Sequence, residues 1–271
     1  CKLFTTNFKQ NAIFIANNYQ TNAWKTNKAI MDFFISTKQR TDKEELMDDF
    51  SIGGDLLRDT LDKLEHINRW LGGNKVTVNG LKSILKNHPK DKEITIVDVG
   101  CGHGDILRDV AKFGRKNNYK FKLIGIDANP TAIDYANELS LEYEELTFET
   151  QDIFSDDFKK REFDVVLATL FFHHFKEPVL VSFLKDTLQQ TKIGIVVNDL
   201  HRHKLAYYLF MLLSIFISNK MIIEDGLTSV LRGFKRKDLV EMSNNINVKS
   251  EISWKWAFRY LWILESSKFK V

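Results

Sequence analysis

The sequence predicts an α/β fold built on a mostly parallel β-sheet, and three observations support this prediction. From Glu93 onward, short apolar segments alternate with segments whose apolar residues recur at helical spacing, as in folds where helices flank a sheet. The chain has 271 residues and is 44% hydrophobic, which is enough for one large domain with a sizeable core. The last two apolar segments, 248–253 and 259–265, are too close together for a crossover helix, so we expect them to pair antiparallel.

The part of the chain before the first strand is expected to lie outside the sheet. Residues 1–40 are rich in Asn, Thr, Phe and Lys, and we expect them to be a loosely ordered N-terminal extension. Residues 41–92 are expected to form a helical cap, because Thr41 and Glu44 have the spacing of a capping box and apolar residues then recur at helical spacing up to position 71. The glycines at 72 and 73 are expected to end this helix, and a second short helix should follow before Pro89.

The region 93–271 is expected to hold the strands and the helices that connect them. The predicted strands are 94–99, 121–126, 146–151, 163–169, 192–198, 248–253 and 259–265. The predicted helices are 104–117, 130–140, 177–190, 203–222 and 235–244, and the segment 203–234 is expected to be a cap over the sheet. The apolar run 205–218 is shorter than the roughly 18 residues that a spanning helix needs. We therefore expect no transmembrane segment, and peripheral contact with a membrane stays open.

A glycine-rich turn follows the first predicted strand. The segment 94–104 reads ITIVDVGCGHG, so an apolar strand ends at Asp98 and alternating glycines then open a helix. Glycine lets a ligand approach the backbone closely, and open α/β sheets bind ligands at the carboxyl ends of their strands. A dinucleotide fingerprint would need a further glycine at position 105, where this chain has Asp105. A carboxylate at a helix N-terminus disfavours a pyrophosphate but suits a ligand with cationic groups.

Two more carboxylates follow the next two predicted strands. Asp127 ends the second strand, 23 residues after Gly104, where it can accept hydrogen bonds from both hydroxyls of a ribose. Asp152 follows the third strand, where it can accept from an adenine amino group while Ile153 packs against the ring. Each aspartate also has a simpler interpretation as a turn or helix-capping residue, and for Asp152 taken alone that interpretation is the stronger one.

With these residues in place, the chain resembles the class I S-adenosylmethionine (SAM)-dependent methyltransferases over about residues 93–271. The resemblance implies a Rossmann-like seven-stranded sheet with an antiparallel last strand, SAM as cofactor, and S-adenosylhomocysteine as product. It also implies a cytoplasmic enzyme, because SAM is made in that compartment. The residues that we expect to bind SAM are Asp98, Gly100, Cys101, Gly102, Gly104, Asp127, Ala128, Asp152, Ile153, Thr169 and Leu170.

The later segments 198–203 and 225–234 resemble bacterial enzymes that methylate small phenolic, quinone-like or polyketide-derived molecules. We therefore expect O-methylation, or C-methylation, of such a molecule. Residues 168–171 lack the Asn or Asp and the prolines that nucleobase-methylating enzymes carry there, and the paired glutamates of arginine methyltransferases are missing. The net charge of +3 gives no reason to expect a nucleic acid partner. RNA or protein methylation, and a non-catalytic SAM-binding module, stay open as alternatives.

Methyl transfer from a sulfonium releases a neutral thioether, so the protein must align the reactants, exclude water and deprotonate the acceptor. Two pairs of histidines follow predicted strands: His173 and His174 after the fourth, and His201 and His203 after the fifth. His201 is the preferred base and His174 is the second candidate. The residues expected to contact the substrate are Trp70, Arg202, Tyr207 and Arg232, with Arg202 orienting an acidic group. The sequence shows no carboxylate cluster suited to a metal ion, so metal-free chemistry is expected.

Overall fold

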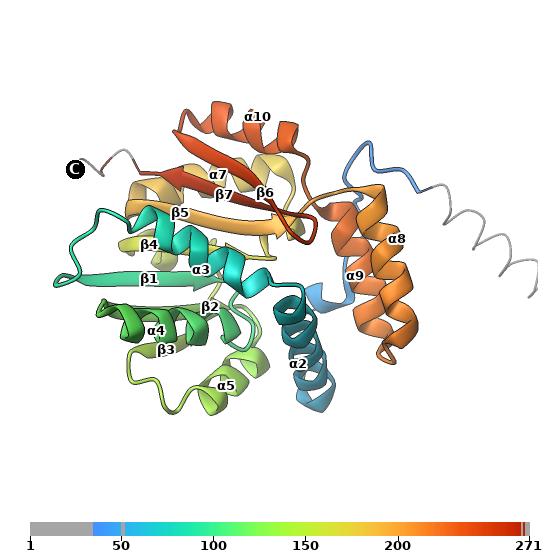
Figure 1. The fold of residues 1–271 in the computed structure, drawn as a ribbon, viewed down its shortest axis with the longest axis horizontal. Coiled ribbons are helices and arrows are strands. Elements are labelled where there is room, and N and C mark those ends of the chain that lie inside the picture. Colours follow the sequence, from blue (N-terminus) through green and yellow to red (C-terminus); the bar gives the residue numbers. More distant parts are fainter. Residues whose placement is uncertain (1–34, 50–51, 267, 269–271) are drawn as a thin grey trace, which may run out of the picture. The chain divides into compact units, whose positions relative to one another are not determined.

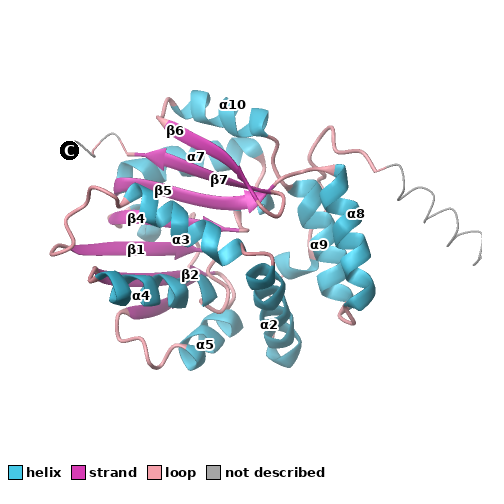
Figure 2. Ribbon diagram, in the orientation of Figure 1, coloured by secondary structure: helices cyan, strands magenta, loops and turns pink. Residues whose placement is uncertain are grey.

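The computed structural model describes residues 35–49, 52–266 and 268, and its described part contains a seven-stranded sheet with helices on both faces (Figures 1 and 2). The strands are β1 (Glu93–Val99), β2 (Lys120–Asp127), β3 (Leu146–Thr150), β4 (Phe163–Thr169), β5 (Thr191–Leu200), β6 (Ser250–Lys255) and β7 (Arg259–Glu265). Their order across the sheet is β3-β2-β1-β4-β5-β7-β6. Strand β7 runs antiparallel to both of its neighbours, and the other six strands share one direction. The predicted fold class is therefore confirmed.

Helices connect these strands and precede them. The α-helices are α2 (Gly54–Trp70), α3 (Gly73–Ile84), α4 (Asp105–Asn117), α5 (Pro130–Leu139), α6 (Asp156–Lys159), α7 (Glu177–Gln190), α8 (Lys204–Leu213), α9 (Lys220–Arg232) and α10 (Arg236–Ile246). Three short 3₁₀ turns are η1 (Leu46–Asp48), η2 (Phe172–His174) and η3 (Ser214–Phe216). All of them belong to one compact unit that begins at Arg40. The predicted extension 1–40 lies almost wholly outside the described residues.

The sheet is buried on both faces, which explains why its central strands read as continuous apolar runs. Successive residues of β1 point to opposite sides: Ile94 and Ile96 join a core shared with α3 and α4, whereas Val97 and Val99 join a core shared with α7 and α10. These two cores pack against both faces of the sheet. The carboxyl ends of the parallel strands therefore form one edge on which side chains can be positioned.

The helices before β1 differ from the prediction in where they begin and in what they contact. Residue Thr41 does not open a helix. Instead the chain forms η1 and then α2, which begins only at Gly54, where the backbone has a positive φ of 63°. Helix α3 contributes Val76 and Leu81 to the core on the sheet. It therefore belongs to the layer that covers β5 and β7 and is not part of a separate cap.

The predicted long helix over 203–222 is a hairpin of two helices. Helix α8 ends at Leu213, and α9 begins after Asn219, whose side chain accepts hydrogen bonds from the backbone N–H groups of Met221 and Ile222. Asparagine is a favoured residue at this capping position, so the segment 203–222 that was predicted as one helix contained the signal for a second helix start. None of the described helices is long and apolar enough to span a membrane.

Candidate active site

The candidate site lies at the edge where β1, β2, β4 and β5 end, and Figure 1 shows α2, α8 and α9 standing beyond that edge. The turn between β1 and α4 has positive φ angles at Gly100, Gly102 and Gly104. A Cβ atom on Gly100 would lie 2.2 Å from the ring of Phe171, and one on Gly104 would lie 2.6 Å from the ring of Phe148. Glycine is thus required at both ends of the turn by conformation and by space.

Asp98 is buried at the end of β1, and its Oδ1 atom has no hydrogen-bond partner. Burial, and then the carboxylates of Asp105 and Asp127, raise the pKa of Asp98 well above its usual range. An unpaired buried oxygen among carboxylates is costly, and a cationic or hydrogen-bond-donating ligand would relieve that cost. The ammonium and sulfonium groups of SAM are such ligands, so this set of residues fits SAM.

Asp127 ends β2 and faces the glycine turn. Its Oδ2 atom accepts a hydrogen bond from the N–H of Gly102 at 2.9 Å, and its Oδ1 atom accepts one from the N–H of Asn129 at 2.9 Å. These bonds fix the carboxylate in place. A carboxylate has about four acceptor sites, so both oxygens keep the capacity to accept ribose hydroxyls.

The other predicted SAM-binding residues surround the same edge. Asp152 is exposed, and its Oδ1 atom accepts from the N–H of Phe154 at 2.8 Å, which is the turn role considered as its simpler interpretation. At the end of β4, Thr169 pairs with Thr77 through their hydroxyls at 2.8 Å. The next residue, Leu170, has a positive φ of 52°, which is unusual for a residue with a Cβ atom. The remaining predicted residues, Cys101, Ala128 and Ile153, lie beside these turns in the sequence, and Cys101 and Ile153 are buried.

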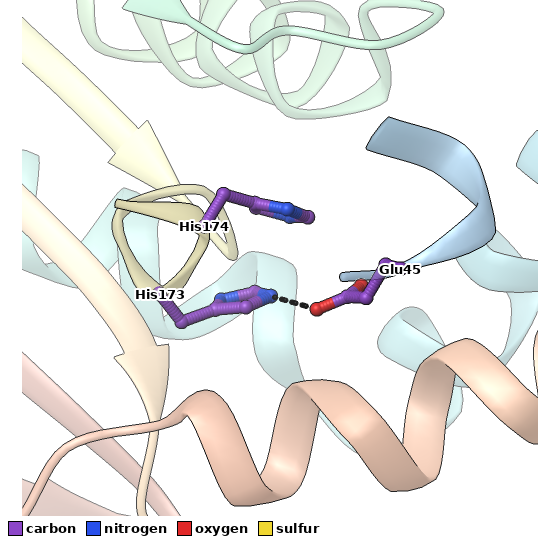
Figure 3. Close-up of side chains that lie close together, drawn as sticks. All are labelled: Glu45, His173 and His174. Carbon is purple, nitrogen blue, oxygen red and sulfur yellow. Dashed lines mark ion pairs between the residues drawn. The ribbon is translucent and has the colours of Figure 1, made fainter. Parts of the chain in front are cut away.

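Two adjacent histidines occupy the turn after β4, and Figure 3 shows their rings lying one above the other. His173 is buried, and its Nδ1 atom lies 2.7 Å from Oδ1 of Asp199, at the end of β5. Its Nε2 atom lies 3.5 Å from Oε1 of Glu45. Burial opposes a charge on this ring, but the two carboxylates outweigh burial and raise the pKa of His173 to about 9. His173 is therefore an ion-paired imidazolium at neutral pH.

His174 is only partly buried, and its Nδ1 atom lies 2.6 Å from Oδ1 of Asp48 in η1. Burial opposes ionisation of Asp48, but hydrogen bonds with His174 and Arg232 hold the pKa of this carboxyl well below its usual value. An ionised carboxylate can only accept, so Nδ1 of His174 carries the proton of this hydrogen bond. In the neutral ring, Nε2 is then the nitrogen with a free lone pair.

Two arginines tie this turn to the segment around η1. The side chain of Arg232 donates to Oδ2 of Asp48 at 2.6 Å and to the carbonyl of His173 at 3.2 Å. The side chain of Arg40 donates to the same His173 carbonyl at 2.6 Å. On the other side, Asp225 of α9 accepts from the backbone N–H groups at the start of η1. The predicted substrate residue Arg232 thus has structural partners that fix Asp48 and the histidine turn.

One group of metal-ligand type is present among the described residues. A ligand atom each from Glu45, His173 and His174 lies within 4.8 Å of the others (Figure 3). The Nε2 atom of His173 faces Glu45 as a protonated donor in the ion pair described above. A metal ion at this position would have to displace that proton and compete with the ion pair.

The predicted base His201 lies at the end of β5, beside the β6–β7 hairpin. Its Nδ1 atom accepts a hydrogen bond from the indole N–H of Trp254 at 3.2 Å. Burial, followed by the cationic neighbours His203, Lys235 and Arg202, lowers the pKa of His201 to about 4. The ring is therefore a weak base.

The other predicted substrate residues are scattered. Arg202 is fully buried and donates to Oδ2 of Asp238 at 2.9 Å and to the carbonyl of Gly233. Tyr207 is buried in α8, whereas Trp70 is exposed at the end of α2. These three side chains come from three separate segments, which are the turn after β5, helix α8 and the end of helix α2.

Arg259 is not among the predicted site residues. It begins β7, is buried, and its Nε and Nη1 atoms have no hydrogen-bond partner. A Cβ atom on Gly73, the first residue of α3, would lie 2.9 Å from its guanidinium carbon, so the cation lies at the positive end of a helix. Burial lowers the pKa of Arg259 to about 10. An anion beside Arg259 would offset the cost of its buried charge and accept hydrogen bonds from its unpartnered nitrogens.

Residues 90–211 match a family described as a methyltransferase domain. This segment is therefore a methyltransferase domain, and the seven-stranded sheet that contains it has the fold of SAM-dependent methyltransferases. No curated protein matches this methyltransferase in sequence.

Several solved structures share the fold of this methyltransferase. The plantazolicin methyltransferase BpumL in complex with S-adenosylhomocysteine is 17% identical, with a TM-score of 0.58 over 78% of this chain and 89% of that chain. The citrinin polyketide synthase CMeT domain is 12% identical, with a TM-score of 0.53 over 70% of this chain and 51% of that one. A SAM-dependent methyltransferase from Aquifex aeolicus is 14% identical, with a TM-score of 0.51 over 77% of this chain and 97% of that one.

Proposed function

We propose that this methyltransferase transfers a methyl group to an ionisable oxygen or carbon of a small molecule, with His174 as the general base. The observation that carries the proposal is the pair of His174 and Asp48, which leaves one ring nitrogen free next to the SAM-binding edge. The carboxylate of Asp48 orients the ring and stabilises the imidazolium that forms when the base takes a proton.

The position of His174 supports this role. The ring of Phe171 packs against Gly100 in the glycine turn, and the ring of His174 lies 6.3 Å from the ring of Phe171, measured between centroids. Burial raises the pKa of Asp127, and the backbone N–H groups of the two adjoining turns oppose this rise, with a smaller opposing effect from His174. The base is thus within electrostatic range of the residue proposed to hold the ribose.

In the proposed reaction SAM provides the methyl group, and the protein aligns the reactants and removes a proton from the acceptor. SAM supplies the methyl group on a cationic sulfur. Nε2 of His174 would accept the proton of the acceptor O–H or C–H, which leaves the acceptor with the electron pair that the methyl group of SAM requires. The proton then leaves His174 for solvent. Asp98, the glycines of the turn, Cys101, Asp127, Ala128, Asp152, Ile153, Thr169 and Leu170 are the residues we propose to hold SAM in line for this step.

His201 is the weaker candidate for the base, in contrast to the preference drawn from sequence. A histidine whose pKa is about 4 has little affinity for a proton at neutral pH, and its Nδ1 lone pair already accepts from Trp254. General bases work best when their pKa lies near the working pH. We therefore assign His201 a role in holding the β6–β7 hairpin to the end of β5.

A small phenolic, quinone-like or polyketide-type acceptor remains the substrate class that we propose. The plantazolicin methyltransferase and the citrinin polyketide synthase CMeT domain, which share this fold, support a natural-product acceptor. We propose that Arg259, and not Arg202 as predicted, orients an acidic group of the substrate. Arg202 is paired with Asp238, whereas two nitrogens of Arg259 have no hydrogen-bond partner. A cytoplasmic location follows from the use of SAM and is part of the same proposal.

Transfer of radiolabelled methyl groups to a panel of acceptors tests this function. The panel comprises phenols, hydroxyquinones and β-ketothioesters, with purified RNA and purified protein as the competing classes. We expect label in the small molecules, and most in those that also carry a carboxylate. Label found only in RNA or protein would overturn the proposal.

A further inference from the structure

The segment formed by α8 and η3 exposes an unusual number of large apolar side chains. Six of them lie within twelve residues: Leu205, Leu209, Met211, Leu212, Ile215 and Phe216. The last two are 72% and 84% exposed, which is close to full exposure for Ile and Phe. Single exposed apolar residues are ordinary on protein surfaces, but a contiguous set marks a surface that binds something apolar.

Three of these side chains, Leu205, Leu209 and Leu212, have the spacing at which residues of an α-helix align on one side. The turn η3 extends the exposed apolar surface beyond the end of α8 with Ile215 and Phe216. The opposite side of α8 is buried against the protein through Ala206 and Tyr207. Phe210 packs so closely on α9 that a Cβ atom on Gly226 would lie 2.2 Å from its ring. Because the inner side of α8 packs against the protein, the opposite side is exposed to solvent.

The charges around this face identify what would cover it. No aspartate or glutamate occurs between Asp199 and Glu224. Lysines stand exposed at both ends of the apolar face, Lys204 at the start of α8 and Lys220 at the start of α9. An apolar helix face with lysines at its margins is the pattern of helices that lie in the plane of a membrane, where the ammonium groups meet lipid phosphates.

The neighbouring β6–β7 hairpin also exposes two tryptophans. Trp254 and Trp256 of the β6–β7 hairpin are 48% and 63% exposed. The hairpin contacts the start of α8, because the ring of Phe258 stacks on that of His203, the residue that caps α8. Tryptophan is enriched where membrane meets water, since its ring is apolar and its N–H is polar.

We propose that the exposed face of α8 and η3 binds peripherally to a lipid bilayer, with Lys204 and Lys220 at the headgroups. Helix α8 has ten residues and is about 15 Å long, so it lies along the bilayer surface and does not cross it. Helix α9 contacts α8 as well as η1 and η2. Binding would thus place the Asp48 and His174 pair one helix layer from the membrane. This inference rests on surface residues and stands whether or not His174 is the base.

Co-sedimentation of the full chain with vesicles tests the proposal, using phosphatidylcholine alone and phosphatidylcholine mixed with phosphatidylglycerol. We expect the wild type to bind the mixed vesicles more strongly, and the double variant Ile215→Glu with Phe216→Glu to lose at least roughly tenfold in affinity. Leu141→Glu is the matched control, because Leu141 is 86% exposed on the loop after α5 and should be replaced without effect on binding. The double variant Lys204→Ala with Lys220→Ala should weaken binding to the mixed vesicles only.

The same variants decide between a bilayer and another partner. Thermal unfolding and SAM affinity should be equal in the wild type and the Glu variants, since the substituted side chains are exposed. A wild type that does not bind either vesicle would overturn the proposal, as would equal binding by the Ile215→Glu and Phe216→Glu double variant. A wild-type dimer that becomes a monomer in this variant, without vesicle binding, would show that a second copy covers the face.

Discussion

Asp48 and His174 are 126 residues apart in the sequence, and their side chains meet at 2.6 Å. The contact joins a short turn before the sheet to the turn after β4. It is held by Arg232, which donates to Asp48 and to the backbone of the histidine turn, and by Asp225, which accepts from the backbone of η1. The proposed base and its orienting carboxylate thus come from segments that only the folded chain brings together.

Replacing Asp127 by Asn should weaken SAM binding without unfolding the protein. The amide keeps the size of the carboxylate but accepts at one atom only, so it cannot hold both the backbone N–H groups and two ribose hydroxyls. We expect SAM affinity to fall by roughly 10- to 100-fold, the equivalent of one or two charge-assisted hydrogen bonds. Calorimetric titration measures this, with Asp152→Asn as the exposed counterpart that should lose much less. Equal losses at both positions would refute the assignment.

The stability of the protein should fall as the pH rises from about 6.5 to 9. The pKa of His173 is raised to about 9 in the folded state from an unfolded value near 6.5, so its contribution is complete below pH 6.5 and is lost on passing through pH 9. The shift corresponds to roughly 3 kcal/mol at most. Thermal unfolding across this range should show the decline in the wild type and a flatter profile in His173→Gln. Parallel profiles would contradict the ion-paired state of His173.

Gly100→Ala should destabilise the protein more than Gly102→Ala. Both positions have positive φ angles, of 68° and 53°, so both pay the conformational cost of about 1 kcal/mol for a residue with a Cβ atom. Only at Gly100 would the new atom lie 2.2 Å from the ring of Phe171, whereas the nearest atom at Gly102 is 3.4 Å away. Displacement of that ring should add about 1–3 kcal/mol. Chemical denaturation measures the difference, and equal losses would show that Phe171 is free to move.

Replacing Arg259 by Met should spare stability and impair substrate binding. The guanidinium is buried without a hydrogen-bond partner at two of its nitrogens, so an apolar side chain of similar length removes an unfavourable charge. We expect an unchanged or higher melting temperature, together with a raised KM for acceptors that carry a carboxylate and an unchanged KM for neutral ones. A loss of stability with no change in KM would make Arg259 a structural residue.

Much of the fold was accessible from the sequence because its strands are apolar runs bounded by turn residues. The seven strands and the antiparallel last strand follow from such runs and from the short connection between 253 and 259. Two features were missed for local reasons. Asn219 divides the predicted helix 203–222 by capping a new helix, and Gly53 and Gly54 delay the start of α2.

The candidate site was accessible only in part. The glycine turn and Asp127 stand out because their residue types are set by backbone conformation and by position at strand ends. No sequence motif marks Glu45, Asp48 or Arg259 as site residues, because their roles arise from contacts between distant segments of the fold. Sequence spacing alone could not rank His201 against His174, because burial and the neighbouring charged groups that lower the pKa of His201 arise only in the folded chain.

The rate of a single methyl transfer, measured with SAM prebound to His174→Gln and to His201→Gln, tests the central claim most directly. General bases contribute roughly 10²- to 10⁴-fold, so we expect His174→Gln to lose at least about 100-fold in rate with SAM affinity within about twofold of wild type. His201→Gln should keep a rate within a few-fold of wild type. An unchanged rate in His174→Gln, with a large loss in His201→Gln, would contradict the account.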